Sequence, residues 1–449
     1  MSVGIRIRRG ASINLLGESE KILSEASPSK TFALKPDNFF GIVPRLVVKE
    51  GESITKGAPV FYSKKDPRIL FVSPVSGLVK EIVRGAKRKI LKIIIEENAG
   101  YAFDHKIYSS NSLDRVKVKE ILLNSGAWPF IKQRPYGIIA QPDVTPKAVY
   151  ISTYASAPLD VDFQFLLKNN KEEFQYGIDV LNHLVDKPVV LSVDATFSGF
   201  FDDIKNVEQL PVNGPHPAGN VSVHIHKHSP INMGEKVWEV RPEDVVNIGK
   251  LFSYGQYSAQ RTVAVAGESV LQPQYIKTKI GAQFSSILDV TGFDISQQNR
   301  FINGDVLTGK AEASDGHLDF YNNLLTIIPE GNHFRMFGWL PFIDNKSHII
   351  PVIIGDPILC KKASQVLLDD FQVYVQPINY PTVPKGEERL RITASPQHTP
   401  KMIKKLVKAL CAVYKNLEIN KLISVSPDKE MVAPSTPNLT PRDAPAPLP

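Results

Sequence analysis

Cysteine is scarce in this sequence, with two residues, Cys360 and Cys411, among 449. Two thiols far apart in the chain cannot form a four-cysteine zinc site or an iron–sulfur cluster. Few cysteines also fit a reduced, cytoplasmic setting better than an oxidising one. We therefore expect a chain that binds no metal of its own.

Long apolar runs are missing as well. A helix that crosses a bilayer needs about 20 consecutive apolar residues, and no stretch of the sequence approaches that length. Residues 1–16 carry charges but no apolar core, so we predict no secretion signal there. Any association with a membrane is therefore expected to depend on a partner or on a surface patch.

Glycine-rich phosphate loops are absent from the region 106–255, which contains neither G-x-G-x-x-G nor G-x-x-x-x-G-K-[ST]. Without clustered glycines the backbone cannot close around a pyrophosphate at a helix N-terminus, so neither NAD nor FMN is an expected ligand. The net charge of +7 favours an acidic partner or an anionic membrane face. Nucleic acid is not expected, because no basic patch is interleaved with aromatic residues.

A chain of 449 residues, 43% apolar and 22% charged, is too long for a single core and predicts several soluble domains. The predicted fold class is multidomain, with α/β and α+β parts. The segments are a β-rich, carrier-like domain (1–105), a Rossmann-like domain (106–255), a small α+β domain (256–342), a further α/β segment (343–425) and a disordered tail (426–449).

Local patterns support these segments. Residues 89–96 are the strongest strand of the first, and its turn at 73–77 matches the hairpin position of lipoyl carriers but lacks their lysine. A helix is predicted at 112–126, capped by Ser112. A strand at 148–152, a helix at 170–185 and a strand at 188–193 then predict a βαβ unit with a parallel sheet. Further expected elements are a short helix near 275–280, strands at 348–354, 373–378 and 389–393, and helices at 357–370 and from 400 onward.

Aromatic clusters with a nearby charge are the first candidate site. An apolar slot with a hydrogen-bond donor suits a quinone headgroup, while packing in the core is the alternative. His216, in a rigid Gly-Pro-His-Pro turn, is a further candidate as proton donor to a quinone oxygen, or else a structural loop residue. The quinone-side candidates are Phe39, Phe40, Trp128, Arg134, Tyr136 and His216.

Two other polar clusters have competing interpretations. Arg84, Lys87 and Arg88 form a basic hairpin tip that would contact an acidic partner or phospholipid, or would simply be solvated. The alternating His224, His226 and His228 would share one face of a strand. We interpret them as the polar face of a half-buried strand and predict no metal site, since no acidic or thiol ligand accompanies them.

Several separated motifs follow one another in order: residues 84–88, 125–128 with 134–135, 214–219 followed by 224–226, 304–309 and 337–339. With these motifs, residues 1 to about 342 resemble the A subunit of the sodium-translocating NADH:quinone reductase. The resemblance implies a barrel-sandwich-like domain at 1–105 and a β-grasp-like domain at 256–342. This resemblance implies a peripheral subunit on the cytoplasmic face of the bacterial inner membrane, without its own redox cofactor. It also implies other reductase subunits as partners and ubiquinone as the substrate of the complex.

Three further runs lie at 347–351, 373–384 and 388–393. By these runs the chain from about residue 343 resembles the C-terminal small domain of 5-aminolevulinate synthase, a pyridoxal-phosphate enzyme. The resemblance implies an aminotransferase-type small-domain fragment at 343–425. The resemblance implies that Arg391 is a remnant of a glycine-carboxylate site, where a guanidinium fork suits the ligand. The alternative for Arg391 is a surface ion pair, because the chain has no match to the Schiff-base lysine.

These observations leave three hypotheses. The leading one is a quinone-side subunit of the reductase that is not catalytic alone. The second is a pyridoxal-phosphate-dependent role related to 5-aminolevulinate synthase. The third is an inactive fusion of the two parts.

Overall fold

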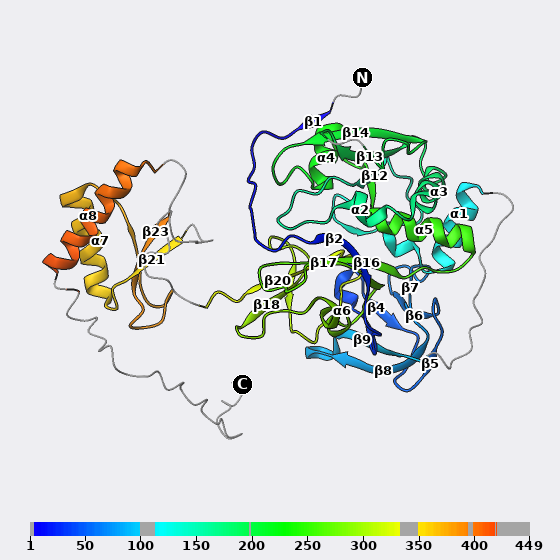
Figure 1. Ribbon diagram of the computed structural model, residues 1–449, viewed down its shortest axis with the longest axis horizontal. Coiled ribbons are helices and arrows are strands. Elements are labelled where there is room, and N and C mark those ends of the chain that lie inside the picture. Colours follow the sequence, from blue (N-terminus) through cyan, green and yellow to red (C-terminus); the bar gives the residue numbers. More distant parts are fainter. Residues whose placement is uncertain are drawn as a thin grey trace. The chain divides into compact units, whose positions relative to one another are not determined.

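The computed structural model describes residues 4–98, 113–196, 199–332, 349–393, 398–417 and 419. It divides into two compact units, Met1–Glu330 and Gly331–Pro449 (Figure 1). Ser112, the motif at 337–339, the junction near 343 and the tail at 426–449 lie outside the described residues. The chain is a mixed α/β protein with several sheets, as the sequence predicts.

Two small antiparallel sheets make up most of the part before residue 98. Val60, Phe61 and Val79 from these sheets are fully buried in a common core. The strongest predicted strand is confirmed as β9, in which Ile93 and Ile95 are fully buried. The first sheet has the order β3 (Thr31–Leu34), β9 (Ile90–Glu97), β8 (Gly77–Arg84), β5 (Ser53–Ile54); the second has β4 (Pro44–Leu46), β6 (Pro59–Ser63), β7 (Leu70–Val72).

A seven-stranded sheet forms the centre of the first unit. The predicted βαβ unit is confirmed, because β12 and β13 pair in parallel with Tyr150 opposite Val190. The helix between them, α3 (Lys171–Asn182), begins after Asn170. The sheet order is β1 (Ile5–Arg6), β14 (Val207–Asn213), β13 (Val189–Asp194), β12 (Val149–Ser152), β15 (Val237–Val240), β10 (Ile131–Arg134), β11 (Ile138–Ile139).

Helices cover both faces of this sheet. On one face the main core packs Val149 of β12 with residues of α3 and α5 (Pro242–Tyr254). On the other face α4 (Val221–His228) packs on Tyr150. Helices α3 and α5 cross closely because each has a glycine at the contact: a Cβ on Gly177 would lie 2.1 Å from the Val245 carbonyl oxygen. Two further helices are α1 (Arg115–Asn124), capped by Asp114, and α2 (Phe163–Leu167).

Five strands after residue 259, together with β2 from near the N-terminus, form a six-stranded sheet, which packs with the helix α6 (Phe284–Thr291). The short helix predicted near 275–280 is wrong: this segment is strand β17, paired with β16 along its length. The β-branched residues Ile276 and Thr278 favour the extended backbone. The order is β19 (Lys310–Glu312), β18 (Asn299–Asn303), β20 (Leu324–Pro329), β16 (Gln260–Ala266), β17 (Gln274–Lys279), β2 (Glu20–Glu25).

The second unit is a three-stranded antiparallel sheet with two helices, and its own core includes Cys360, Leu367, Leu390 and Val413. The predicted helix starts are confirmed, because Asp356 and Thr399 accept hydrogen bonds from the first turns of the helices. The elements are β21 (Ile349–Ile353), α7 (Pro357–Phe371), β22 (Gln376–Ile378), β23 (Arg389–Thr393) and α8 (Pro400–Asn416).

Candidate functional site

The quinone-side candidate Phe39 lies in an aromatic cluster. It follows the short helix η1 (Pro36–Asn38) and is 2% exposed. Its ring centroid lies 4.3 Å from that of Phe71, 4.9 Å from Phe320 and 5.9 Å from Tyr321. Such tilted and edge-to-face contacts are the favoured geometries for packed aromatic rings. The ring of Phe39 is therefore a core element, the alternative that the sequence left open.

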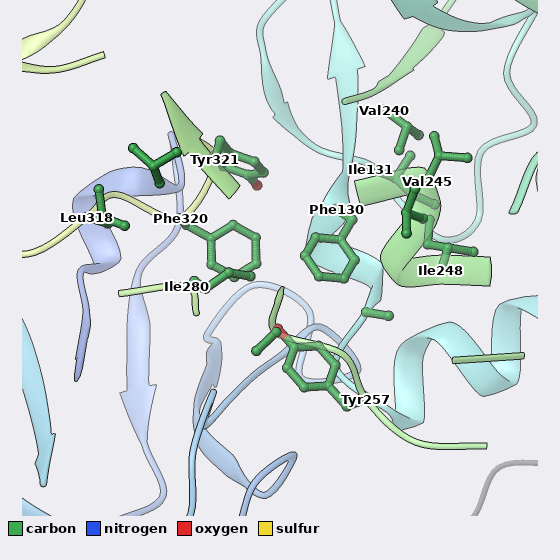
Figure 2. Packing of buried hydrophobic residues seen from close by; sticks show 14 of the residues in the cluster. Phe130, Ile131, Val240, Val245, Ile248, Tyr257, Ile280, Leu318, Phe320 and Tyr321 are labelled. Carbon is green, nitrogen blue, oxygen red and sulfur yellow. The ribbon is translucent and has the colours of Figure 1, made fainter. Parts of the chain in front are cut away.

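Trp128 is also part of the core. It opens the short helix η3 (Trp128–Phe130), is fully buried, and its indole Nε1 donates to the Ala140 carbonyl oxygen at 2.7 Å. The ring centroid of its neighbour Phe130 lies 5.5 Å from that of Phe320. Figure 2 shows these two rings facing each other in the cluster. Phe320 thus packs against both Phe39 and Phe130.

Phe320 and Tyr321 join the two candidate segments, and sequence reasoning missed both. The hydroxyl of Tyr321 donates to the Pro129 carbonyl oxygen at 2.6 Å. The backbone N–H of Phe320 donates to the Asn38 side chain at 2.9 Å. The only signal in the sequence is a pair of adjacent aromatic residues in a loop, which carries no periodicity. The structure therefore brings 38–40 and 128–134 together through a third segment.

The exposed members of the candidate set lie at the rim of this cluster. Phe40 and Tyr136 are each 69% exposed. A Cβ added to Gly41 would lie 3.6 Å from Ile138, so the turn after Phe40 packs against the strand that follows Tyr136. Arg134, at the end of β10, is 30% exposed and pairs with Glu239 at 2.6 Å. The rim thus offers apolar rings and a partly neutralised guanidinium.

Lys132, two residues before Arg134, is a cation above the aromatic cluster. Its Nζ lies 3.5 Å from the centre of the Tyr321 ring. Burial, and next the charge of Arg241, lower the pKa of Lys132 to about 8. Lys132 and Glu239 are paired in register across β10 and β15, on the same face as Arg134. A lysine with this pKa can hold or release a proton near neutral pH.

A buried ionic network lies behind Tyr321. Arg261 of β16 is fully buried and donates to Asp244 at 2.7 Å, with Glu243 at 3.4 Å. Asn323 and the backbone N–H of Thr262 donate to Glu243. Burial raises the pKa of both carboxyl groups, and the Arg261 charge opposes that shift. These bonds connect helix α5, which packs on the seven-stranded sheet, with strand β16 of the six-stranded sheet.

A polar pocket of about 200 Å³ lies nearby. The strand order proceeds from β12 to β13 and β14 on one side and returns to β15 on the other, so the topological switch point lies between β12 and β15. Asp160 and Arg241, from the loops after these two strands, line the pocket together with 303–305 and 308–310. Its polar wall includes the partly buried Asp160, whose pKa is raised by desolvation, and is poorly suited to a quinone ring.

His216 lies away from the other candidates. It follows β14, which is four strand spacings from β10, or about 19 Å across the sheet. Its ring Nδ1 lies 3.2 Å from the Ser156 hydroxyl, and its carbonyl oxygen accepts from the Ala11 N–H. These contacts are those of a structural loop, the alternative that the sequence left open for His216.

The strand predicted for the three histidines is wrong, because 221–228 is helix α4. Over so short a stretch, the alternation of Val, His and Ile is compatible with both the two-residue period of a strand and the 3.6-residue period of a helix. His224 is buried and bonds to the Ala218 carbonyl oxygen, whereas His226 is exposed. His228 contacts Tyr150 and Glu208. Among the residues that the structure describes, no group of three His, Cys, Asp or Glu side chains is arranged to hold a metal ion.

Comparison with known proteins matches three family models in the first unit: the NqrA N-terminal barrel-sandwich hybrid domain at 5–98, the NqrA second alpha/beta domain at 113–257 and the NQRA C-terminal domain at 262–313. The A subunit of the Na(+)-translocating NADH-quinone reductase of Yersinia pseudotuberculosis is 32% identical over 340 residues, 75% of this chain and 76% of the relative. The corresponding Neisseria gonorrhoeae protein is 30% identical over 355 residues, 78% of this chain and 79% of the relative.

The chain belongs to the NqrA family, the A subunits of Na(+)-translocating NADH-quinone reductases. This confirms the resemblance inferred from the separated motifs. A solved NAD+-reducing [NiFe]-hydrogenase aligns with 41% of this chain and 41% of its own at a TM-score of 0.32 and 10% identity. That likeness is too slight to inform the fold or the site.

The last part of this NqrA family member matches a different family model. Residues 332–410 match aminotransferase class I and II, which confirms the second resemblance at the level of that family. The remnant candidate Arg391 lies in β23 with an exposed side chain, opposite Gln376 and Pro351 on the neighbouring strands.

The predicted basic tip of this NqrA family member is the β8–β9 hairpin. Arg84, Lys87 and Arg88 are all exposed there. Lys89, beside them, pairs with Asp37 at 2.8 Å. Since Asp37 belongs to η1, the basic tip lies next to the segment that carries Phe39 and Phe40.

Proposed function

We propose that this chain is a peripheral subunit of a sodium-pumping NADH:ubiquinone oxidoreductase and contributes to its quinone side without a redox cofactor of its own. Membership of the NqrA family supports the assignment to the complex. In the described part of the chain, no helix is long and apolar enough to cross a membrane. The other subunits would then hold it at the cytoplasmic face of the bacterial inner membrane, and the basic tip at Arg84, Lys87 and Arg88 would be one contact.

One observation carries the quinone assignment: Phe320 and Tyr321 unite the two candidate segments into a single packed body. Its exposed rim, with Phe40, Arg134 and Tyr136, would contact the quinone headgroup. Aromatic rings supply apolar contact, and the arginine and the phenol supply donors to the quinone oxygens. Phe39 and Trp128 would not contact the quinone; they would hold the rim residues in place by packing in the core.

A photoreactive ubiquinone analogue, applied to the assembled reductase, tests this. We expect label on peptides that contain Phe40 or Tyr136, reduced by excess ubiquinone. Arg134→Gln should raise the KM for quinone, whereas Arg300→Gln, in a surface pair with Glu330, should leave it unchanged. Label confined to other subunits, with an unchanged KM in Arg134→Gln, would refute the quinone contact.

Two domain types predicted from the sequence extend this proposal. We infer that 106–255 is Rossmann-like and that 256–342 is β-grasp-like, with the boundaries predicted from the sequence. The parallel strands β12, β13 and β14 support the first description. The mixed six-stranded sheet packed with α6 supports the second.

A second candidate function follows from the aminotransferase match at 332–410. A pyridoxal-phosphate enzyme requires a lysine that forms the internal aldimine, and the sequence offers no match to that lysine's context. We expect no aldimine absorbance when pyridoxal phosphate is added to the full chain. A stable aldimine band would favour this second function, and failure both to join the reductase and to bind pyridoxal phosphate would favour an inactive fusion.

A further inference from the structure

The second unit has a helix with strongly segregated charge. Helix α8 carries five lysines and no acidic residue in Pro400–Asn416. At 100° per residue these lysines fall within an arc of roughly 100° on the helix surface. All five have exposed side chains, and they are Lys401, Lys404, Lys405, Lys408 and Lys415.

The opposite side of α8 packs into the core of its unit. Ala409 and Val413 are completely buried, and Leu406 and Leu410 pack against them. Figure 1 shows α7 and α8 side by side on the sheet of β21 and β23. The helix therefore cannot turn its apolar face outward without unfolding the unit, and only the lysine face is available to a ligand.

The lysines of α8 have no carboxylate partners among the described residues of the chain. Acidic residues at i+3 or i+4 would stabilise such lysines on a surface helix, but α8 contains none. Here five like charges follow one another over four turns. Their mutual repulsion disfavours the helix slightly, and a surface of negative charge would relieve that cost.

We propose that the lysine face of α8 binds the anionic phospholipid headgroups of a membrane. Each lysine held near an anionic surface strengthens partitioning about fivefold, which corresponds to about 1 kcal/mol. Five lysines on one face of the helix can therefore hold a peripheral protein at a membrane without insertion. The aminotransferase-like unit would then have a role that does not depend on catalytic residues.

The shape of the patch favours a membrane over a nucleic acid. The lysines extend over about 20 Å of one straight helix face, which matches a flat surface. Exposed Met402, 52% accessible beside Lys401 and Lys405, is an apolar group of the kind that dips into the headgroup region. Single-stranded nucleic acid is usually bound on aromatic stacking platforms, and the exposed residues of α8 include no aromatic ring.

Vesicle sedimentation of the full chain tests the proposal. We expect binding to vesicles that contain one third phosphatidylglycerol in phosphatidylcholine, little binding to pure phosphatidylcholine, and loss of binding at high salt. Equal binding to both vesicle types, or binding that salt does not weaken, would overturn it. Tighter binding to a duplex oligonucleotide than to the anionic vesicles, at the same salt, would also overturn it.

A matched pair of variants separates the α8 face from net charge. Lys404→Gln with Lys408→Gln should weaken partitioning about thirtyfold, because glutamine keeps the helix and removes two charges. Lys385→Gln with Arg391→Gln removes two charges from the loop and strand of the same unit, and should change partitioning by less than about threefold. If both double variants lost the same amount of vesicle binding, with unchanged circular dichroism, the binding would depend only on net charge. That result would contradict the proposal.

Discussion

The hydroxyl of Tyr321 donates a hydrogen bond to the carbonyl oxygen of Pro129 at 2.6 Å, although 192 positions separate the two residues. This bond connects the loop before β20 with the helix η3 that leads into β10. It brings together segments 38–40 and 128–134, which we predicted from the sequence as candidates for quinone contact. No sequence pattern in either segment indicates that the two are neighbours.

Tyr321→Phe should lower the free energy of unfolding by about 1–3 kcal/mol, since it leaves the Pro129 carbonyl oxygen without its buried donor. Denaturant unfolding followed by circular dichroism measures the change. Tyr136→Phe is the control, because its phenol lies at an exposed turn, and it should stay within about 0.5 kcal/mol. Equal effects of the two substitutions would contradict a special role for Tyr321.

Arg261→Met should destabilise the first unit by about 3–5 kcal/mol, because Glu243 and Asp244 would remain buried without their cation. The comparison is Arg300→Met at the surface pair with Glu330, for which we expect less than about 1 kcal/mol. Thermal melts of both variants at one pH provide the measurement. A tolerated Arg261→Met would mean that the two carboxyl groups are protonated in the native state.

The lowered pKa of Lys132 predicts a pH dependence of stability. Its folded pKa of about 8 lies below the ordinary 10.5, so between these values the unfolded chain holds a proton that the folded chain has lost. Stability from this residue therefore rises with pH across that window, by up to about 3 kcal/mol. Unfolding of wild type and Lys132→Met at pH 7 and pH 10 measures it. A difference between the two proteins that does not change with pH would contradict the shift.

Gly177→Ala provides a test in which two effects oppose each other. Helix propensity alone predicts a gain of about 0.5–1 kcal/mol in an exposed helix interior. The close crossing with α5 predicts a loss of more than that gain, because the new Cβ would meet the Val245 carbonyl oxygen. Denaturant unfolding gives the sign, and a stabilised variant would show that the helices separate easily.

The regular elements were predictable where periodicity is strong. The parallel pair β12 and β13 with α3 between them follows from apolar spacing, and Asp356 and Thr399 mark the helix starts by their capping chemistry. The helix α4 and the strand β17 were mispredicted, because short stretches that are rich in β-branched residues fit both periods until tertiary packing decides.

The candidate site was predictable only in part. Phe39 and Trp128 gave a local aromatic signal, but whether a ring is buried or exposed depends on residues distant in sequence. Phe320 and Tyr321 could not be found, since their importance lies in contacts to Phe39, Phe130 and Pro129 across the fold. The seven-stranded sheet likewise separates His216 from the rim, which no local pattern reveals.

Assembly with the membrane subunits is the central expectation for this chain. The most direct measurement is purification of the tagged full chain from detergent-solubilised membranes of cells that express the other reductase subunits. We predict that those subunits elute with the chain in fixed ratio and that omission of the chain lowers sodium-dependent quinone reduction. A chain that elutes alone, while the remaining subunits reduce quinone at the full rate, would contradict this role.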